Sequence, residues 1–296
     1  MILLSCIIIT ALPFMRAKHH NLFEYMHRYG GWSILAAFWA HFFLFTYELS
    51  TKSDHTFIHL VLIAPAFWLL VVALVFTVLP WFFLRKVRAY PVRLSPHAIQ
   101  LCFYEPIHLF KGVGLSKTRF GELHSFAAIP NRDGTGFSTL VSAAGDWTRA
   151  TINKPQEYYW LRGIPRTGVL CIAPLFSKIL VVATGSGIGP CLGVIQDLPC
   201  CEVRLLWFAR QPFATFGADI CEKVLSVDPE AMITDSTRPA PNGSKVKLDA
   251  FLVAYNAYVA TNPEAVLVIS NKKTTTDLIY AFRRRNVPCF GPIWDS

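Results

Sequence analysis

The first third of the chain contains three apolar blocks, whereas the rest mixes charges, prolines and short apolar runs. The blocks are Ile2–Met15, Gly30–Tyr47 and Phe57–Leu84. A membrane-spanning helix needs roughly twenty apolar residues, so the first block is short, the second is marginal, and the third is long enough to span with some tilt. We predict about three membrane helices and interpret the first as the remaining part of a longer one.

Basic residues flank these blocks unevenly, whereas the loop 48–54 between the second and third blocks is acidic on balance. Lys and Arg concentrate on the cytoplasmic side of membrane helices. Both basic clusters therefore belong in the cytosol, and two crossings separate them. We predict an integral membrane protein in contact with the lipid bilayer, with its C-terminal domains cytosolic. The basic residues are Arg16, Lys18 and Arg28 after the first block, and Arg85, Lys86, Arg88 and Arg93 after the third.

After residue 88 the pattern changes twice. Residues 89–176 contain short apolar runs broken by turn residues, the pattern of a small antiparallel β-barrel. Residues 177–296 alternate between strand-like and helix-like segments, which is typical of a parallel α/β domain. The sequence predicts a membrane α-helical N-terminal part over residues 1–88, followed by the barrel and by an α/β nucleotide-binding domain.

A glycine-rich turn follows the apolar run Ile179–Ala183 and opens a predicted helix. Glycines allow close approach and unusual backbone angles, and a helix N-terminus offers N–H groups and positive potential to a pyrophosphate. The turn is therefore a candidate dinucleotide site. The spacing differs from that of the Rossmann motif, so a plain tight turn remains the alternative. The candidate residues are Thr184, Gly185, Ser186, Gly187, Gly189 and Pro190.

Three further places are candidates for cofactor contact. In the barrel region, Leu123-His-Ser-Phe-Ala127 ends a predicted strand with an aromatic ring and a hydroxyl group, and Gly145-Asp-Trp-Thr148 forms a turn suited to pyrophosphate. Arg210 follows a predicted strand, where an arginine can receive the 2′-phosphate of NADPH. The alternatives are an ordinary barrel strand, an ordinary β-turn and a solvated arginine.

His27 and His41 lie in or beside the second apolar block, fourteen positions apart. On an α-helix they would face within roughly 40° of each other and stand about 21 Å apart, the arrangement of a two-heme ladder. A second helix with a matching pair is missing from the sequence, because His55 and His59 sit together near one end of the third block. Either a partner helix lies outside this chain or no heme is bound.

Composition narrows the classes of function. The chain has 296 residues, 53% of them hydrophobic, and a net charge of +9. No arginine-rich arm interleaved with aromatic residues accompanies this charge, so we expect no nucleic-acid partner and interpret the cations as membrane-edge anchors. The eight cysteines show no C-x-x-C pair or metal-site spacing, which argues against a zinc site or a disulfide framework.

The order of these segments resembles the ferric reductase and NADPH oxidase superfamily, whose cytosolic half is a ferredoxin-NADP reductase-like module. Residues Met15–His27 are similar to the family's segment around the first heme histidine, and Trp207–Arg210 is similar to its strand bearing the 2′-phosphate arginine. The nearest likeness is to fungal TmpA-type integral membrane flavoproteins. It is carried by Gly145–Thr148, Trp160–Gly163, Ala183–Pro190 and Phe290–Ser296.

This resemblance implies FAD and NADPH as cofactors and assigns residues to them. The FAD motif corresponds to His124, Ser125 and Phe126 together with Gly145 and Thr148, and Trp294 is carried over as a cofactor-binding residue. It also implies His27 and His41 as heme ligands. Heme binding stays open, and we expect this chain not to complete the two-heme ladder.

The chain departs from the family pattern at three places. His124-Ser-Phe-Ala127 stands where the family has His-Pro-Phe-Thr, and Ser270-Asn271 stands where a Cys-Gly pair is usual near the nicotinamide. The family's first helices are absent apart from the initial block, which a truncated gene product would explain.

These observations predict a membrane-bound flavoprotein oxidoreductase that moves electrons from NADPH through FAD towards an acceptor not readable from the sequence. One alternative is a reductase-like membrane protein with impaired catalysis and a scaffold, signalling or developmental role. Another is a cytosolic domain that reduces a soluble or tethered small molecule without heme.

Overall fold

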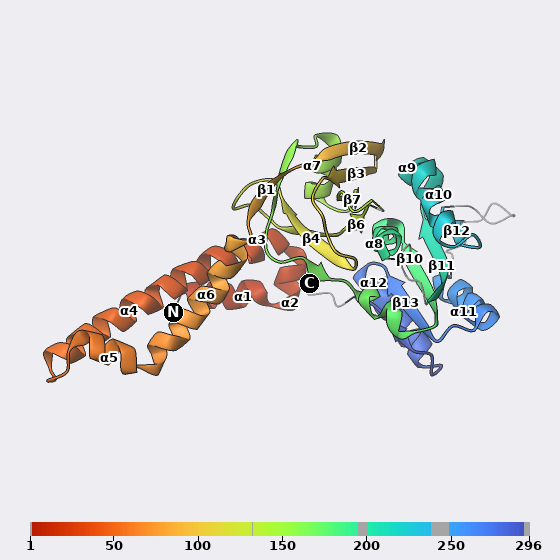
Figure 1. The fold of residues 1–296 in the computed structure, drawn as a ribbon. Helices are drawn as coiled ribbons and strands as arrows, with labels where there is room; N and C mark the ends of the chain where they lie inside the picture. The colour runs from red at the N-terminus through yellow and green to blue at the C-terminus, as the bar shows by residue number, and fades with distance from the viewer. Residues whose placement is uncertain (1, 132, 195–200, 238–248, 293–296) are drawn as a thin grey trace. The chain divides into compact units, whose positions relative to one another are not determined.

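The computed structural model describes residues 2–131, 133–194, 201–237 and 249–292, and the chain forms two compact units. The first unit is helical and ends at Phe82, and the second begins at Phe83 with the β-structure (Figure 1). The change of unit falls two residues before the end of the third apolar block, and the first short strand begins at Arg85.

Prolines divide the first unit into more helices than its apolar blocks suggest. The first block breaks at Leu12, which is extended because Pro13 follows it. The third block breaks in the same way at Ala64, before Pro65. The helices of the first unit are α1 (Ile2–Ala11), α2 (Pro13–Lys18), α3 (His20–Tyr25), the π-helical turn η1 (Met26–Gly30), α4 (Gly31–Thr51), α5 (Phe57–Ile63) and α6 (Pro65–Phe82).

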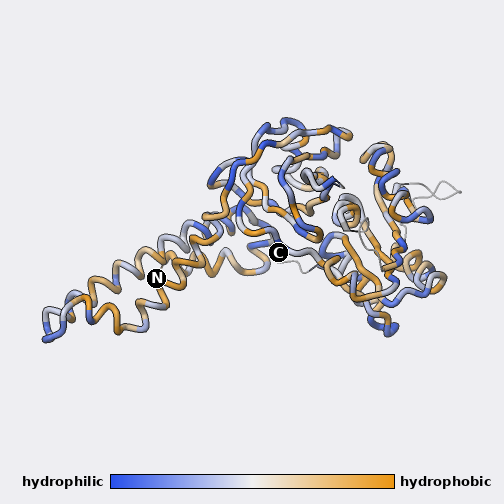
Figure 2. Tube along the Cα trace, in the orientation of Figure 1, coloured by the Kyte–Doolittle hydropathy of each residue, from blue (hydrophilic) through white to orange (hydrophobic). Residues whose placement is uncertain are grey.

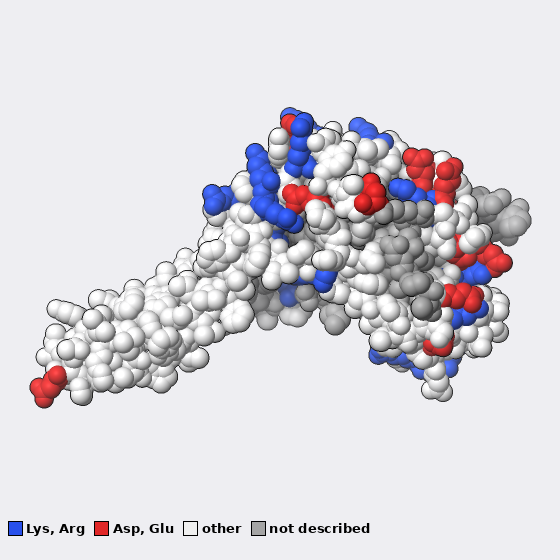
Figure 3. Space-filling view, viewed as in Figure 1, with Lys and Arg blue, Asp and Glu red and all other residues white. Residues whose placement is uncertain are grey.

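Aromatic contacts hold α4 and α6 side by side and antiparallel. Trp32 meets Trp81 with ring centroids 5.8 Å apart, and Trp39 meets Phe67 at 5.9 Å. The outward faces of both helices carry many exposed apolar side chains. Figure 2 shows much of both helices in the hydrophobic colour, and Figure 3 shows few charged residues over them. Among the described residues, α6 is the one helix whose length and composition suit a membrane crossing, with a mean hydropathy of 2.1.

The second unit starts with two antiparallel sheets that form the predicted barrel. One sheet has the order β1-β8-β4-β5, with β9 paired to β4, and the other has the order β2-β3-β7-β6. The element bounds are β1 (Arg85–Arg88), β2 (Tyr90–Ser95), β3 (Ala98–Phe103), β4 (Lys111–Ser116), β5 (His124–Ala127), β6 (Ile129–Pro130), β7 (Phe137–Ser142), α7 (Asp146–Asn153), β8 (Tyr158–Leu161), β9 (Arg166–Thr167) and the 3-10 helix η2 (Val169–Leu175).

A five-stranded parallel sheet follows, with the order β12-β11-β10-β13-β14. In chain order this is 3-2-1-4-5, so the topological switch point, where such folds bind ligands, lies between β10 and β13. The bounds are β10 (Lys178–Thr184), η3 (Gly185–Gly187), α8 (Ile188–Val194), β11 (Glu202–Ala209), α9 (Pro212–Phe216), α10 (Ala218–Val227), β12 (Met232–Asp235), α11 (Ala250–Thr261), β13 (Ala265–Ile269), α12 (Lys272–Arg283) and β14 (Cys289–Phe290).

The central strands β10 and β13 and most of β11 are buried on both faces. Val181 and Trp207 point into a core covered by α8, α9 and α10, while Leu180 and Leu206 point into a second core beneath α11 and α12. The first of these cores also contains Leu140 of the barrel. The barrel and the parallel sheet therefore share one hydrophobic core inside the second unit.

Candidate nucleotide and flavin site

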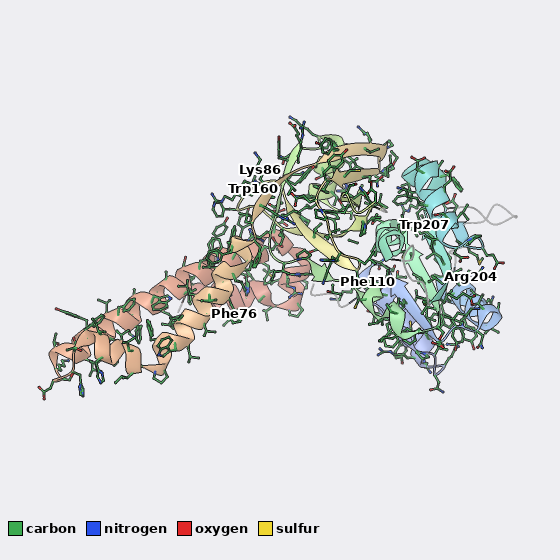
Figure 4. All side chains as sticks on the ribbon, viewed as in Figure 1. Phe76, Lys86, Phe110, Trp160, Arg204 and Trp207 are labelled. Carbon is green, nitrogen blue, oxygen red and sulfur yellow. The ribbon has the colours of Figure 1, made fainter. Side chains whose placement is uncertain are left out.

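The glycine turn lies at the carboxyl end of β10, at the switch point. Gly185 has a φ of +53°, a conformation that favours glycine. The indole Nε1 of Trp207, labelled in Figure 4, donates a hydrogen bond of 2.8 Å to the Gly185 carbonyl. This bond fixes the first residue of the turn from the neighbouring strand.

Gly187 is required for packing as well as for ligand approach. A Cβ atom built on Gly187 would lie 2.4 Å from the carbonyl oxygen of Ile269 in β13. The sequence alone suggests that a larger residue here would spare the fold and reduce only NADPH binding. The structure corrects this expectation, because any side chain would push the turn away from β13.

Hydroxyl groups connect the turn to its neighbours. Thr184 and Ser270, at the carboxyl ends of β10 and β13, lie 2.6 Å apart through their side-chain oxygens. The Ser142 hydroxyl, at the end of β7 in the barrel, donates to the Ser186 hydroxyl at 2.8 Å. The turn is thus anchored both within the parallel sheet and to the barrel.

The helix that follows the turn packs closely on the barrel. A Cβ on Gly193 would lie 2.9 Å from the Ala128 carbonyl oxygen, whereas one on Gly189 would make only ordinary contact with Leu140 at 3.5 Å. The Cys191 thiol donates to the Gly187 carbonyl at 3.5 Å. Burial raises the pKa of this thiol to about 12, so it remains neutral and unreactive.

Arg210 lies at the carboxyl end of β11, beside the strand that ends in the glycine turn. Its side chain is exposed, and its carbonyl accepts from the Thr215 hydroxyl at 2.8 Å. Next to it, Gln211 has a φ of 41°, and its N–H donates to Asp235 at 3.0 Å. The backbone around Arg210 is therefore fixed, while the guanidinium group faces solvent at the edge where a nucleotide would lie.

The predicted FAD strand, β5, presents two different faces. Its partners in β4 are Leu115 for His124, Gly114 for Ser125 and Val113 for Phe126. His124 and Phe126 therefore lie on the face that includes the buried Val113 and Leu115, whereas Ser125 and Ala127 lie on the glycine face. The outer face of this strand pair is nearly free of large side chains, which suits a planar ring.

Trp147 covers the other face of β5. Its ring centroid lies 4.5 Å from that of His124 and 5.5 Å from that of Phe126, and the Lys117 ammonium group lies 4.9 Å from it. Burial lowers the pKa of Lys117. Trp147 belongs to the predicted motif Gly145–Thr148, but the sequence does not indicate that its ring contacts His124 and Phe126.

Thr148 has a different role from the one expected. Its hydroxyl accepts hydrogen bonds from the backbone N–H groups of Ala144 and Gly145, both at 2.9 Å, and donates to the Gly145 carbonyl at 2.9 Å. The side chain therefore caps α7 and is not a free pyrophosphate ligand. Gly145 is the N-cap residue of this helix, and a Cβ there would meet open space.

A pocket of about 260 Å³ joins the two halves of the site. The barrel contributes Phe110, labelled in Figure 4, together with Gly112 and the β5 segment. Pro190 and Ile269 close it from the parallel sheet. This is a fitting place for a flavin ring, because it is mostly apolar, partly enclosed, and continuous with the glycine turn. Its lining residues are Phe110, Lys111, Gly112, Ser125, Phe126, Ala127, Ala128, Arg166, Thr167, Gly168, Val169, Leu170, Pro190, Ile269 and Pro292.

The two candidate heme ligands lie in the first unit. His27 belongs to the π-helical turn η1 and His41 to α4, and both side chains are exposed. A π-turn rotates less per residue than an α-turn, so the angle calculated for a regular helix does not apply. Within the described residues, no group of three or more metal-ligating side chains comes together. Trp294 lies outside the described residues.

The sequence of this chain matches one family model over part of its length and two curated proteins over nearly all of it. Residues 169–296 match a family model described as the C-terminal domain of adenylate-forming reductase 03009. Adenylate-forming reductases 06235 and 03009 of Coprinopsis cinerea are each 40% identical over 98% of this chain. The chain spans 28% of the length of each of these relatives.

Solved structures resemble the second unit. A ferredoxin NADP+ reductase from Neisseria gonorrhoeae with bound FAD and NADP has a TM-score of 0.56 at 11% identity, covering 71% of this chain and 98% of that one. The Plasmodium falciparum ferredoxin-NADP+ reductase with 2′P-AMP has a TM-score of 0.55 at 10% identity, covering 71% and 95%. The predicted order of an antiparallel barrel and a parallel α/β domain is thus confirmed, and the chain contains a ferredoxin-NADP reductase-like fold.

Proposed function

We propose that this chain is a flavoprotein oxidoreductase that takes electrons from NADPH through FAD to a further acceptor. The observation that carries the proposal is the pocket between the barrel strands and the glycine turn, closed by Pro190 and Ile269. Similar solved proteins bind FAD and NADP on the same fold. NADPH bound at the turn and a flavin bound in the pocket would meet at the wall formed by Pro190 and Ile269.

The residues present fit both cofactors. FAD supplies the redox chemistry, accepting a hydride and passing electrons on singly or in pairs. The backbone N–H groups after Gly185 would bind the NADPH pyrophosphate, and Arg210 would pair with the 2′-phosphate. The glycine face of β4 and β5, with Ser125 and Ala127, would support the flavin ring. Thr184 and Ser270 would position the nicotinamide by their hydroxyl groups.

The names of the curated relatives join adenylate formation to reduction. We propose that this module supplies the reduction, so that its acceptor is a small molecule held or delivered by other parts of such a protein. This favours the reduction of a tethered small molecule without heme over a ferric reductase that sends electrons across the bilayer. The ferric reductase and TmpA-type assignment rests on the motifs alone.

Membrane attachment by the first unit is part of the proposal. It is supported by the apolar outward faces of α4 and α6, where Phe76 is 70% exposed and Leu69 is also 70% exposed. Exposed apolar surface on this scale usually marks an interaction with a membrane or with another protein. Extraction of cell membranes at high pH tests this part, because an integral protein stays in the pellet and a peripheral one is released.

A scaffold role without catalysis is the second candidate. Two observations favour it: Ala127 lacks the hydroxyl of the family motif, and the Thr148 hydroxyl is used in capping. Both remove ligands that would otherwise bind FAD. The two functions therefore differ first in whether FAD binds at all.

The test is FAD binding by the full chain purified in detergent, followed by anaerobic addition of NADPH. An oxidoreductase retains FAD and loses the visible flavin absorption when NADPH is added. A chain that neither copurifies with FAD nor binds added FAD is a scaffold. If FAD binds but neither NADPH nor NADH reduces it, the proposed electron donor is wrong and the proposed FAD site stands.

A further inference from the structure

Two cations line the flavin pocket, and none of the lining residues that the structure describes is acidic. Lys111 and Arg166 belong to this lining, whose other polar side chains are Ser125 and Thr167. The remaining walls are apolar or glycine, which lowers the screening of charge inside the pocket. An arrangement of this kind favours a ligand with negative charge.

Strand pairing fixes the two cations on adjacent strands. In the β4–β9 pair, Lys111 is opposite Thr167 and Gly112 is opposite Arg166. The Lys111 ammonium group donates to the Thr167 hydroxyl at 2.8 Å, which orients it and leaves two of its three N–H donors. Because side chains alternate along a strand, Arg166 lies on the glycine face with Gly112, and Lys111 lies on the opposite face with Thr167.

Arg166 is not used by the fold. Its side chain is exposed, and it makes no ion pair or side-chain hydrogen bond with any residue that the structure describes. Arg88, an equally peripheral cation of the barrel, is instead paired with Glu157 at 2.7 Å. A pocket arginine without an acidic partner retains its full charge and its five N–H donors for a ligand.

We propose that Arg166 binds the negative charge that the flavin acquires on reduction. This inference rests on the proposed function. NADPH would give a hydride to the neutral oxidised ring, so NADP+ would leave with one more positive charge and the reduced ring would carry one negative charge. The Arg166 guanidinium group would stabilise the charged ring over the neutral one and so favour electron flow into the pocket.

The experiment measures the midpoint potential of FAD bound to the full chain in detergent, by equilibration with a reference dye. The variants are Arg166→Gln and Arg166→Lys, which keeps the charge, and Lys111→Gln serves as a comparison on the opposite face of the strand pair. Arg93→Gln is the matched control, because Arg93 is an exposed barrel cation on β2 outside the pocket lining. Affinity for oxidised FAD is measured in parallel.

Arg166→Gln is expected to weaken binding of reduced FAD about tenfold relative to oxidised FAD, and Lys111→Gln should have a smaller effect. For a two-electron couple a tenfold change equals a fall of about 30 mV. Arg166→Lys should restore most of the potential, and Arg93→Gln should leave it unchanged. Binding of both states of the flavin would weaken equally if Arg166 served only to position the ring.

An unchanged potential in Arg166→Gln overturns the inference and leaves the proposed function intact, since the wild-type chain still binds FAD and accepts electrons. A fall of equal size in Arg93→Gln also overturns it, because the effect would then come from net charge. Failure of the wild-type chain to bind FAD contradicts the proposed function itself.

Discussion

Gly187 and Gly189 belong to one motif, yet substitution by alanine should affect the fold in opposite ways. A methyl group on Gly187 would lie 2.4 Å from the Ile269 carbonyl oxygen, which is a backbone atom of a buried central strand. Neither partner has a flexible end that can move aside. The turn must therefore shift as a unit away from β13.

The cost has two parts. Forcing an extra methyl group into a packed site typically costs about 1–3 kcal/mol of unfolding free energy. The shift also separates Thr184 from Ser270, whose hydroxyl contact of 2.6 Å is worth about 0.5–1.5 kcal/mol. Gly187→Ala should thus destabilise the second unit by roughly 2–4 kcal/mol.

Gly189→Ala is the matched control. Its Cβ would meet Leu140 at 3.5 Å, an ordinary contact, and Gly189 is the second residue of α8. Alanine there should stabilise the helix by less than the value of about 0.5–1 kcal/mol that holds for the middle of a helix. Urea unfolding of both variants in the same detergent, followed by circular dichroism, gives the comparison. Equal stability of Gly187→Ala and the wild type, or equal losses in both variants, would refute the packing argument.

Three further predictions follow from the charges and ligands described above. Arg210→Ala should weaken NADPH binding more than tenfold and leave NADH nearly unchanged, because a charge-assisted bond is worth roughly 1.5–3 kcal/mol; equal losses in titrations with both nucleotides would make Arg210 structural. Heme should stay below two per chain in a pyridine hemochromogen assay, and two hemes, lost in His41→Ala, would reveal unrecognised ligands. Phe76→Arg should reduce the membrane-integrated fraction, since a central arginine costs about 2.5–3.5 kcal/mol on insertion, whereas Tyr280→Arg, at a 63% exposed position of α12, should not; no difference in pelleting would count against a spanning α6.

The regular parts of the second unit were largely readable from hydropathy. The segment Glu202–Ala209 has the hydropathy of a strand and is β11, and the apolar run Ile179–Ala183 is β10 with one more residue at each end. The short strands β12 and β14 were not predicted. They lie at the two edges of the sheet and contain four and two residues, too few for a periodic pattern to show.

The site was only partly predictable because its contacts join distant segments. Sequence identified the glycine turn but not the bonds that fix it, since Trp207 is 22 positions from Gly185 and Ser142 is 44 positions from Ser186. It also showed that Thr148 has a hydroxyl group, without showing that the helix cap uses it. The break before Pro65, by contrast, was already present as a local signal in the sequence.

The two walls of the flavin pocket are held together by the fold. Leu140 of the barrel lies in the same core as Val181 and Trp207 of the parallel sheet. Gly193 allows α8 to approach the Ala128 carbonyl, where a Cβ would be 2.9 Å from it. The barrel wall, which would hold the flavin, and the wall formed by Pro190 and Ile269 are therefore in place before a cofactor binds. Less binding energy is then spent on bringing the two walls together. Its geometry should therefore respond more to core substitutions at this junction than to changes in the solvent-facing loops.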